Sequence, residues 1–214
     1  MLILFLLTCV YAFLLLFLTI GMLLLKSPGA VSDYQNISVI VAARNEEENL
    51  PKLMQQLATQ NYPNQNFEVI IANDRSTDRT SEVVLSFTKD NSNIKLVEIN
   101  SEQEDLIGKK NALNMAINIA RYEILAFTDA DCLPSENWLT EINRHFRGDV
   151  DYLMGHSPLI LNSPVWWQLL KNLERNAFFA IAAGAFFWHW PITSTARNMA
   201  YRKSIFLKSG GFSD

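Results

Sequence analysis

Short apolar runs alternate with stretches of helical periodicity between residues 37 and 146, and this alternation limits the possible folds more than any other feature. Four runs predict strands; the first two have the length and composition of strands that are buried on both faces, whereas the third alternates less cleanly. These runs cover residues 37–42, 67–72, 94–99 and 122–128. Apolar residues recur at helical spacing over residues 46–60, 77–87, 109–121 and 135–146. This order predicts an α/β domain with a mainly parallel sheet flanked by helices.

Charged residues follow three of the four predicted strands. Arg44 and Glu46 come after the first strand, Asp74 after the second, and Asp129 with Asp131 after the fourth. In open parallel sheets, ligands bind outside the carboxyl ends of the strands, and these ends share one edge. Solvation of the loops would explain some of this polarity, but it explains less well why acids recur beside arginines. The pattern therefore predicts a ligand site at this edge.

Asp129 and Asp131 form an Asp-x-Asp pair at the end of the fourth run. In an extended chain, residues two apart point to the same side, so the two carboxylates share a face, roughly 6–7 Å apart along the backbone. Two acids this close repel each other unless a positive charge lies beside them. Mg²⁺ is commonly held by one or two carboxylates together with substrate phosphates. The alternative, two solvated acids at the exit of a strand, stays open on this pair alone.

The N-terminus predicts a membrane anchor. No charged residue occurs from Leu2 to Leu25, and this length reaches the roughly 20 apolar residues of a membrane-spanning helix. A signal peptide would have a basic start and a small-residue cleavage site, and neither is present. We therefore expect an anchor over 1–25, a linker over 26–36 and a domain over 37–214. Lys26 favours an inner-membrane protein with a single span and a cytoplasmic domain.

Charge and cysteine usage narrow the class of partner. The 214 residues carry a formal net charge of -4 and no block of basic residues, so nucleic acid is not an expected partner. The two cysteines, Cys9 and Cys132, are poor candidates for a disulfide, which agrees with a reducing compartment. Cys132 is interpreted as a small, partly buried residue in preference to a nucleophile.

The aromatic segment over residues 166–190 has two different halves. Lys171, Glu174 and Arg175 interrupt the first half, whereas the second half is uncharged and too short to span a bilayer. Because Trp favours the membrane–water interface, one hypothesis is a helix lying on or dipping into the bilayer surface. The alternative is an ordinary buried helix.

Four polar segments follow one another along the domain. They are Arg44-Asn45-Glu46, Asn73-Asp74-Arg75-Ser76-Thr77-Asp78-Arg79-Thr80, Gly108-Lys109-Lys110-Asn111-Ala112-Leu113-Asn114 and Thr128-Asp129-Ala130-Asp131. In this order they resemble family 2 glycosyltransferases, and together they are far more specific than any one of them. The resemblance runs from about Ile37 to the C-terminus, and it implies a GT-A fold that binds a nucleotide-sugar and transfers a sugar such as a hexose.

The resemblance also implies a role for each matching residue. Ala43, Arg44 and Glu46 match the segment against the nucleotide, and Asp74 matches the acid that hydrogen-bonds the base. Lys109 matches a basic residue near the nucleotide, although a solvated lysine pair with Lys110 at a helix start is the alternative. Asp129 and Asp131 match the pair that serves the donor and a divalent cation, Mg²⁺ or Mn²⁺.

On the acceptor side, the resemblance points to Arg197, Asn198 and Arg202. An inverting transfer needs a carboxylate base to take the proton from the acceptor hydroxyl. In the family that base lies just beyond the segment matching Gly210-Gly211-Phe212, and Asp214 falls slightly early for it. We therefore expect the base to follow Asp214, the sequence to be a fragment, and this chain to bind a donor without efficient transfer.

The implied partners are a UDP- or GDP-sugar and a lipid-linked or saccharide acceptor. Two other classes remain open at this point. A nucleotidyltransferase shares the α/β plan but usually has a glycine-rich loop after the first strand, and none is present here. A membrane-tethered module that binds a nucleotide-sugar without catalysis is the second alternative.

Overall fold

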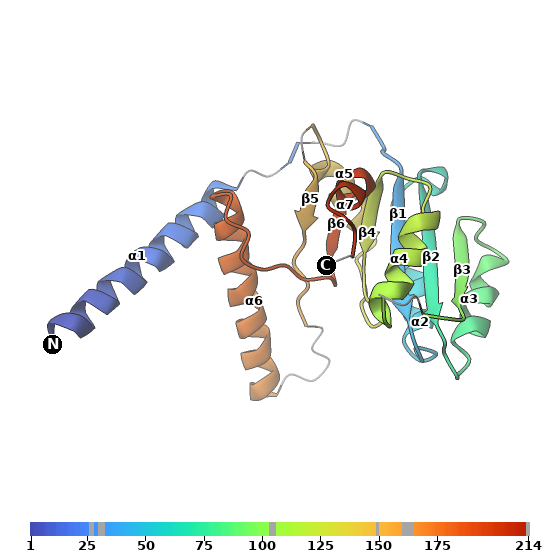
Figure 1. Cartoon of the computed structure of the whole chain (residues 1–214), viewed down its shortest axis with the longest axis horizontal. Coiled ribbons are helices and arrows are strands. Elements are labelled where there is room, and N and C mark those ends of the chain that lie inside the picture. Colours follow the sequence, from blue (N-terminus) through green and yellow to red (C-terminus); the bar gives the residue numbers. More distant parts are fainter. Residues whose placement is uncertain (26–27, 30–32, 103–105, 149, 160–164, 213–214) are drawn as a thin grey trace. The chain divides into compact units, whose positions relative to one another are not determined.

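The computed structural model describes residues 1–25, 28–29, 33–102, 106–148, 150–159 and 165–212 (Figure 1). The chain forms two compact units. One comprises Met1–Pro28 and Gly155–Thr195, and the other comprises Gly29–Met154 and Ala196–Asp214. Lys26, part of the predicted linker and Asp214 lie outside the described residues, so the predictions that depend on them stay predictions.

The larger unit is built on one mixed sheet, which has six strands in the part of the chain that the structure describes. Their order is β3-β2-β1-β4-β6-β5. The first four pair in parallel, β6 pairs antiparallel with β4, and β5 pairs antiparallel with β6. The strands are β1 (Ile37–Ala43), β2 (Phe67–Asp74), β3 (Ile94–Ile99), β4 (Ile124–Phe127), β5 (Tyr152–Met154) and β6 (Met199–Arg202). The predicted α/β fold class is confirmed.

Helices cover both faces of this sheet because its central strands are apolar on both sides. Val39 and Val41 point into one core cluster, and Ile40, one position apart, points into the other. The first cluster takes side chains from α2, α3 and α5, and the second takes side chains from α4. These helices are α2 (Leu50–Ala58), α3 (Thr80–Thr88), α4 (Lys109–Ile119) and α5 (Trp138–His145); a short helix, α7 (Lys203–Lys208), follows β6.

Several predicted boundaries were wrong, and loop hydrogen bonds explain two of them. The helix predicted over 46–60 begins at Leu50, and the one predicted over 77–87 begins at Thr80. Residues before these starts are held in loops, where Asp78 accepts hydrogen bonds from the backbone N–H groups of Glu47 and Thr80. The helix predicted from residue 135 begins at Trp138, after a turn. Strands β5 and β6 were not predicted because they are only three and four residues long.

A fully buried acid, Glu68, ties together the amino ends of the first three strands. Its carboxylate accepts hydrogen bonds from Ser38 Oγ (2.7 Å), Lys95 Nζ (2.7 Å) and the backbone N–H and Nε of Arg121 (2.7 and 3.1 Å). Burial favours the neutral acid, but these donors outweigh it and hold the pKa of Glu68 below its usual range. Glu68 is therefore a structural acid with every oxygen engaged.

The smaller unit is a pair of helices, α1 (Leu2–Leu24) and α6 (Trp166–Phe187). Among the described residues, α1 is the helix that is long and apolar enough to cross a membrane, and almost all of it is exposed. The aromatic segment is helical, as predicted, but α6 buries only Ala182–Ala185. Within the described residues, most of α6 is therefore not buried.

Candidate functional site

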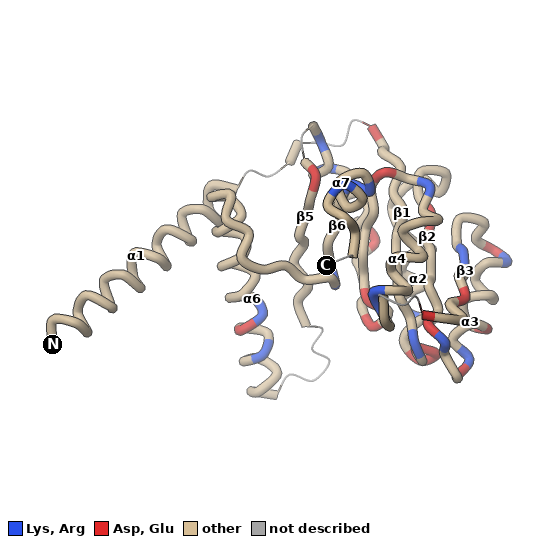
Figure 2. The backbone as a smooth tube through the Cα atoms, viewed as in Figure 1, with Lys and Arg blue, Asp and Glu red and all other residues tan. Residues whose placement is uncertain are grey.

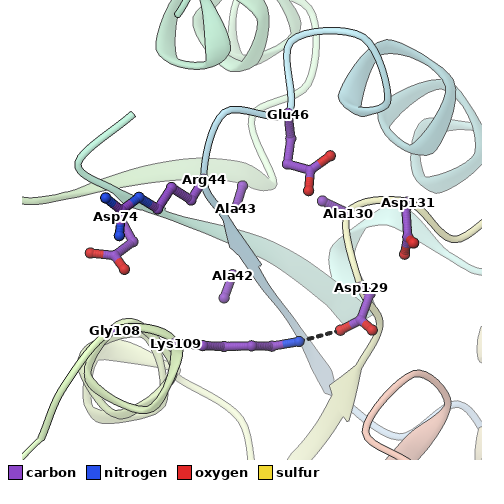
Figure 3. A pocket seen from close by; sticks show the side chains of 10 residues that line it. All are labelled: Ala42, Ala43, Arg44, Glu46, Asp74, Gly108, Lys109, Asp129, Ala130 and Asp131. Atoms are coloured by element: carbon purple, nitrogen blue, oxygen red, sulfur yellow. Dashed lines mark hydrogen bonds and ion pairs between the residues drawn. The ribbon is translucent and has the colours of Figure 1, made fainter. Parts of the chain in front are cut away.

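A cavity of about 330 Å³ opens at the carboxyl end of the parallel strands (Figure 3). Every residue predicted for the donor or the metal lines it. The lining consists of Ala42, Ala43, Arg44, Glu46, Asp74, Gly108, Lys109, Asp129, Ala130 and Asp131. The structure thus brings these residues together, while their roles toward a ligand remain predictions.

The register of the strands explains why these residues meet. Ala43 on β1 pairs with Asn73 on β2, so Arg44 and Asp74 leave the sheet side by side. On its other edge β1 pairs in parallel with β4, which puts Asp129 at the same end of the sheet. The chain runs from β1 to β2 on one side, whereas β4 lies on the other. The cavity therefore lies at a topological switch point, where open α/β sheets bind ligands.

Two basic side chains contact Asp129. Lys109 Nζ lies 2.5 Å from Oδ1 and Arg197 Nε lies 3.4 Å from Oδ2. Lys109 is the first residue of α4 and follows Gly108, whose φ of 59° suits a glycine. Arg197 comes from the antiparallel strand pair, in which Phe127 pairs with Met199. Extending that register by two residues each way sets Arg197 opposite Asp129.

Asp131 supplies the second carboxylate and is exposed. One ligand atom each from Asp129, Asp131 and Cys132 lies within 4.8 Å of the others. Hard cations such as Mg²⁺ and Mn²⁺ prefer carboxylate oxygens, and both acids can present one to the same ion. The two aspartates therefore fit a divalent cation.

Cys132 does not suit this chemistry. Burial and the neighbouring carboxylates of Asp131 and Asp129 raise the pKa of its thiol. A thiol that stays protonated is a poor ligand for a hard cation and a poor nucleophile. This agrees with the interpretation of Cys132 as a small, partly buried residue.

Asp74 is almost fully buried at the end of β2. Its Oδ1 accepts a hydrogen bond from Arg75 Nε at 2.8 Å, and Arg75 also contacts Glu102 at 2.5 Å. Glu102 in turn accepts a hydrogen bond from the backbone N–H of Gly108 at 3.1 Å. This chain of contacts connects the end of β2 to the start of α4, and hence to Lys109.

Side chains from the loop after β2 hold the loop after β1. Asn45, with a φ of 55°, accepts a hydrogen bond from the backbone N–H of Thr77 (2.8 Å), and its own N–H donates to Ser76 Oγ (2.9 Å). The N–H of Glu46 donates to Thr80 Oγ1 (2.9 Å). Much of the polar segment after β2 therefore builds the loop that carries Arg44 and Glu46.

Comparison with known proteins decides the family. The profile of "Glycosyl transferase family 2" matches residues 38–210. The chain belongs to this family. This match covers the strand-end segments and the cavity residues described above.

Relatives of this family 2 chain include a bacterial and an archaeal protein. The "Probable glycosyltransferase YdaM" of Bacillus subtilis is 27% identical over 188 residues, covering 86% of this chain and 44% of the relative. "Glycosyltransferase AglE" of Haloferax volcanii is 35% identical over 103 residues, covering 48% of this chain and 33% of the relative. The chain thus spans less than half the length of these two relatives.

Solved structures confirm the GT-A fold. The mannosyltransferase PcManGT from Pyrobaculum calidifontis, in complex with GDP-Man and Mn²⁺, superposes with a TM-score of 0.71 at 20% identity. That match covers 95% of this chain and 56% of PcManGT. S. aureus TarS 1-349 in complex with UDP-GlcNAc superposes with a TM-score of 0.59 at 22% identity, covering 82% of this chain and 48% of that TarS chain.

The three residues predicted for the acceptor side of the family 2 chain lie in different surroundings. Arg197 contacts Asp129, whereas the amide oxygen of Asn198 accepts a hydrogen bond from Trp138 Nε1 at 2.9 Å. Arg202 pairs with Ile124, at the amino end of β4. Its guanidinium donates to the backbone carbonyls of Val150 and Gly148 (3.1 and 3.3 Å). The structure therefore does not bring Arg202 to the cavity.

Sequence reasoning missed two contacts of this site. Glu102 lies between a strand and a helix and belongs to none of the four segments, so no motif marks it. Arg197 was placed on the acceptor side, and its contact with Asp129 depends on the register of two short strands. No local pattern in the sequence specifies that register.

Proposed function

We propose that this chain carries the donor site of a membrane-anchored glycosyltransferase that uses a divalent cation. The reaction moves a sugar from a UDP- or GDP-sugar to a lipid-linked or saccharide acceptor, with inversion. The observation that carries the proposal is the shared cavity of Asp129, Asp131, Lys109 and Asp74 at the switch point of the sheet. PcManGT with GDP-Man and Mn²⁺, and TarS with UDP-GlcNAc, support this choice of donor.

Asp129 and Asp131 would hold the cation. When bound, Mg²⁺ or Mn²⁺ supplies positive charge that neutralises the leaving diphosphate as the glycosidic bond breaks. The exposed position of Asp131 and the partial exposure of Asp129 leave room for a second ligand, such as phosphate oxygens, at the same ion.

In this proposal Lys109 and Arg197 also bind the diphosphate of the donor. Both contact Asp129 in the structure, and both side chains are about half exposed. When a donor occupies the cavity, its phosphate oxygens offer these cations a stronger acceptor, because the diphosphate carries more charge than one carboxylate. The two basic residues therefore neutralise the charge of Asp129 before the donor binds and the charge of the diphosphate after it binds.

Arg44 and Asp74 lie where the nucleoside would bind, at the ends of β1 and β2. Arg75 donates a hydrogen bond to Oδ1 of Asp74. Within the described part of the chain, no group donates a hydrogen bond to Oδ2 of Asp74. A base that presents an N–H group, as uracil and guanine both do, can donate to that oxygen. The base itself stays undetermined by these residues.

Helix α1 supports the membrane part of the proposal. Its 23 residues carry no charge and have the length of a single span. Leu18 and Gly21 are buried, Phe17 is partly buried, and the other residues of α1 are exposed. We propose that α1 anchors the protein in the inner membrane with the α/β unit on the cytoplasmic side.

Calorimetry with UDP and GDP, each with and without Mn²⁺, tests the donor site. We expect one of the two to bind only when the metal is present. A folded sample without metal-dependent binding of either nucleotide would refute the proposal. Products separate the remaining classes: a glycosyltransferase releases nucleoside diphosphate from its donor, a nucleotidyltransferase releases pyrophosphate, and a binding module releases neither.

A further inference from the structure

We propose that α6 is a second lipid-contacting helix, and that one apolar face of α6 and the surface of α1 bind the acyl chains of the same bilayer. The inference rests on the membrane anchoring by α1 proposed above and goes beyond it. It assigns a partner to a helix that contributes nothing to the donor cavity. Three observations within the smaller unit carry it.

The first observation is a close glycine crossing between the two helices. A Cβ atom added to Gly184 would lie 2.1 Å from the backbone oxygen of Leu18, and one added to Gly21 would lie 2.4 Å from that of Gly184. Trp188 Nε1 also donates a hydrogen bond to the backbone oxygen of Phe17 at 3.0 Å, and the two rings stack at 4.4 Å. Small residues permit such backbone contact between membrane helices. This crossing holds α6 directly against the candidate span.

The second observation is the direction of the apolar face of α6. At about 100° per residue, Trp166 lies about five turns before Gly184 on the same side, and Leu170 and Leu173 lie within about 40° of that line. These three side chains are 73%, 54% and 65% exposed. The face that meets α1 near one end of α6 therefore continues as an exposed apolar stripe toward the other end.

The third observation concerns the opposite face of α6, where polar side chains are partly buried against the same unit. Arg175 Nη1 donates to the backbone oxygen of Ser157, and Asn172 accepts a hydrogen bond from the N–H of Leu159. In Figure 2, charged residues occur on the first half of α6, and α1 carries none. The polar side thus has partners within its own unit, whereas the side toward α1 has exposed leucines.

These observations favour a bilayer over a second protein chain as the partner. The two helices diverge from their crossing, as Figure 1 shows, and the apolar stripe of α6 and most side chains of α1 are exposed. Acyl chains can cover both exposed surfaces without a matching shape, whereas a protein partner would need to fit both. Trp166 and Trp167 at the start of α6, and Trp188 at its end, are of the type enriched at membrane interfaces.

Fluorescence quenching in liposomes tests the inference on the full chain. Native Cys9, labelled in a Cys132→Ser background, reports insertion of α1. Leu173→Cys, labelled in a Cys9→Ser and Cys132→Ser background, reports the apolar face of α6. We expect lipids brominated on their acyl chains to quench both labels strongly. Leu85→Cys is the matched control, because Leu85 is also an exposed leucine of a helix and should keep its fluorescence.

The outcomes separate the two proposals. If Cys9 is quenched while the label at Leu173 behaves like that at Leu85, the inference about α6 fails and the anchor stands. If Cys9 is not quenched, the anchor fails. A label at Leu173 that is shielded from both lipid bromine and aqueous iodide indicates a second copy of the chain, and this too overturns the inference.

A substitution at the crossing tests how α6 is held. Gly184→Leu should reduce quenching of the label at Leu173 and leave that of Cys9 unchanged, because the added side chain forces the helices apart. Gly29→Leu is the control, since no atom lies within 4 Å of its added Cβ. Unchanged quenching at Leu173 in the Gly184→Leu variant would refute the glycine crossing as the link.

Discussion

Glu68 and Asp129 are both acids contacted by two basic side chains, and they lie at opposite ends of the same parallel strands. Glu68 has no exposed surface and accepts four hydrogen bonds. Asp129 keeps 21% of its side chain exposed and borders a cavity that a second acid, Asp131, also lines. Ion pairing alone therefore does not distinguish a structural acid from one that awaits a ligand.

The difference lies in what each acid has left to bind. Every acceptor position of Glu68 is taken by groups that the fold already holds, and the pKa of Glu68 is lowered as a result. The partners of Asp129 are long side chains that are about half exposed and can reach another anion. A partly exposed acid with such cations beside a cavity has the features of a binding site.

The largest expected effect comes from Asp129→Asn. We expect the affinity for the Mn²⁺-dependent nucleotide to fall about 100-fold or more, because loss of a hydrogen-bond partner of a metal ligand already weakens metal binding about 10–100-fold. Calorimetry measures this loss. The free energy of unfolding should change by less than about 1 kcal/mol, since Asp129 is partly exposed. An Asp129→Asn variant that loses stability and retains nucleotide affinity would show that Asp129, like Glu68, is a structural acid.

Glu68→Gln should have the opposite profile. The amide keeps the volume of the side chain but turns one acceptor into a donor that faces Lys95 and Arg121. We expect the free energy of unfolding to fall by about 2 kcal/mol in urea titrations. Nucleotide affinity of the folded protein should be unchanged. The surface variant Glu82→Gln is the control and should stay within about 0.5 kcal/mol of the parent protein.

Acid pH should affect the stability of the parent protein and of the Glu68→Gln variant differently. Because the pKa of Glu68 is lower in the folded than in the unfolded chain, its contribution is complete above the unfolded value, near 4.5, and disappears as pH falls through the folded value. We expect the parent protein to lose stability over this range. Glu68→Gln should lose less, and equal losses in urea titrations at each pH would contradict the assignment.

Lys109→Met should give the smallest change in affinity, and the change for Mn²⁺ alone should be an increase. Removing the cation that pairs with Asp129 should tighten binding of Mn²⁺ alone roughly two- to fivefold, as expected for a partly exposed ion pair worth about 0.5–1 kcal/mol. Binding of the nucleotide with Mn²⁺ should weaken, because a cation near the diphosphate is lost. Lys110→Met is the control, as Lys110 makes no ion pair among the described residues. Weaker binding of Mn²⁺ alone would contradict the proposed task of Lys109.

Local patterns predicted the four parallel strands because each is a short, mostly apolar run; β1, β2 and β4 are almost wholly buried, whereas β3, at the edge of the sheet, is partly exposed. The antiparallel strands β5 and β6 have no such run. Their residues are only partly buried apart from Ala200, so burial imposes little pattern on them. The predicted start of α3 was wrong because side-chain hydrogen bonds between two loops, distant in sequence, determine where the helix begins.

Local sequence patterns sufficed to predict the parallel strands and the charged residues of the cavity, because parallel strands bring their carboxyl ends to one edge. The partners of these charged residues depend on the tertiary structure. Antiparallel register sets Arg197 against Asp129, burial at the other end of the sheet commits Glu68 to the fold, and a crossing of Gly21 with Gly184 joins two helices. Such contacts join residues that are far apart in the chain, and local sequence patterns do not specify them.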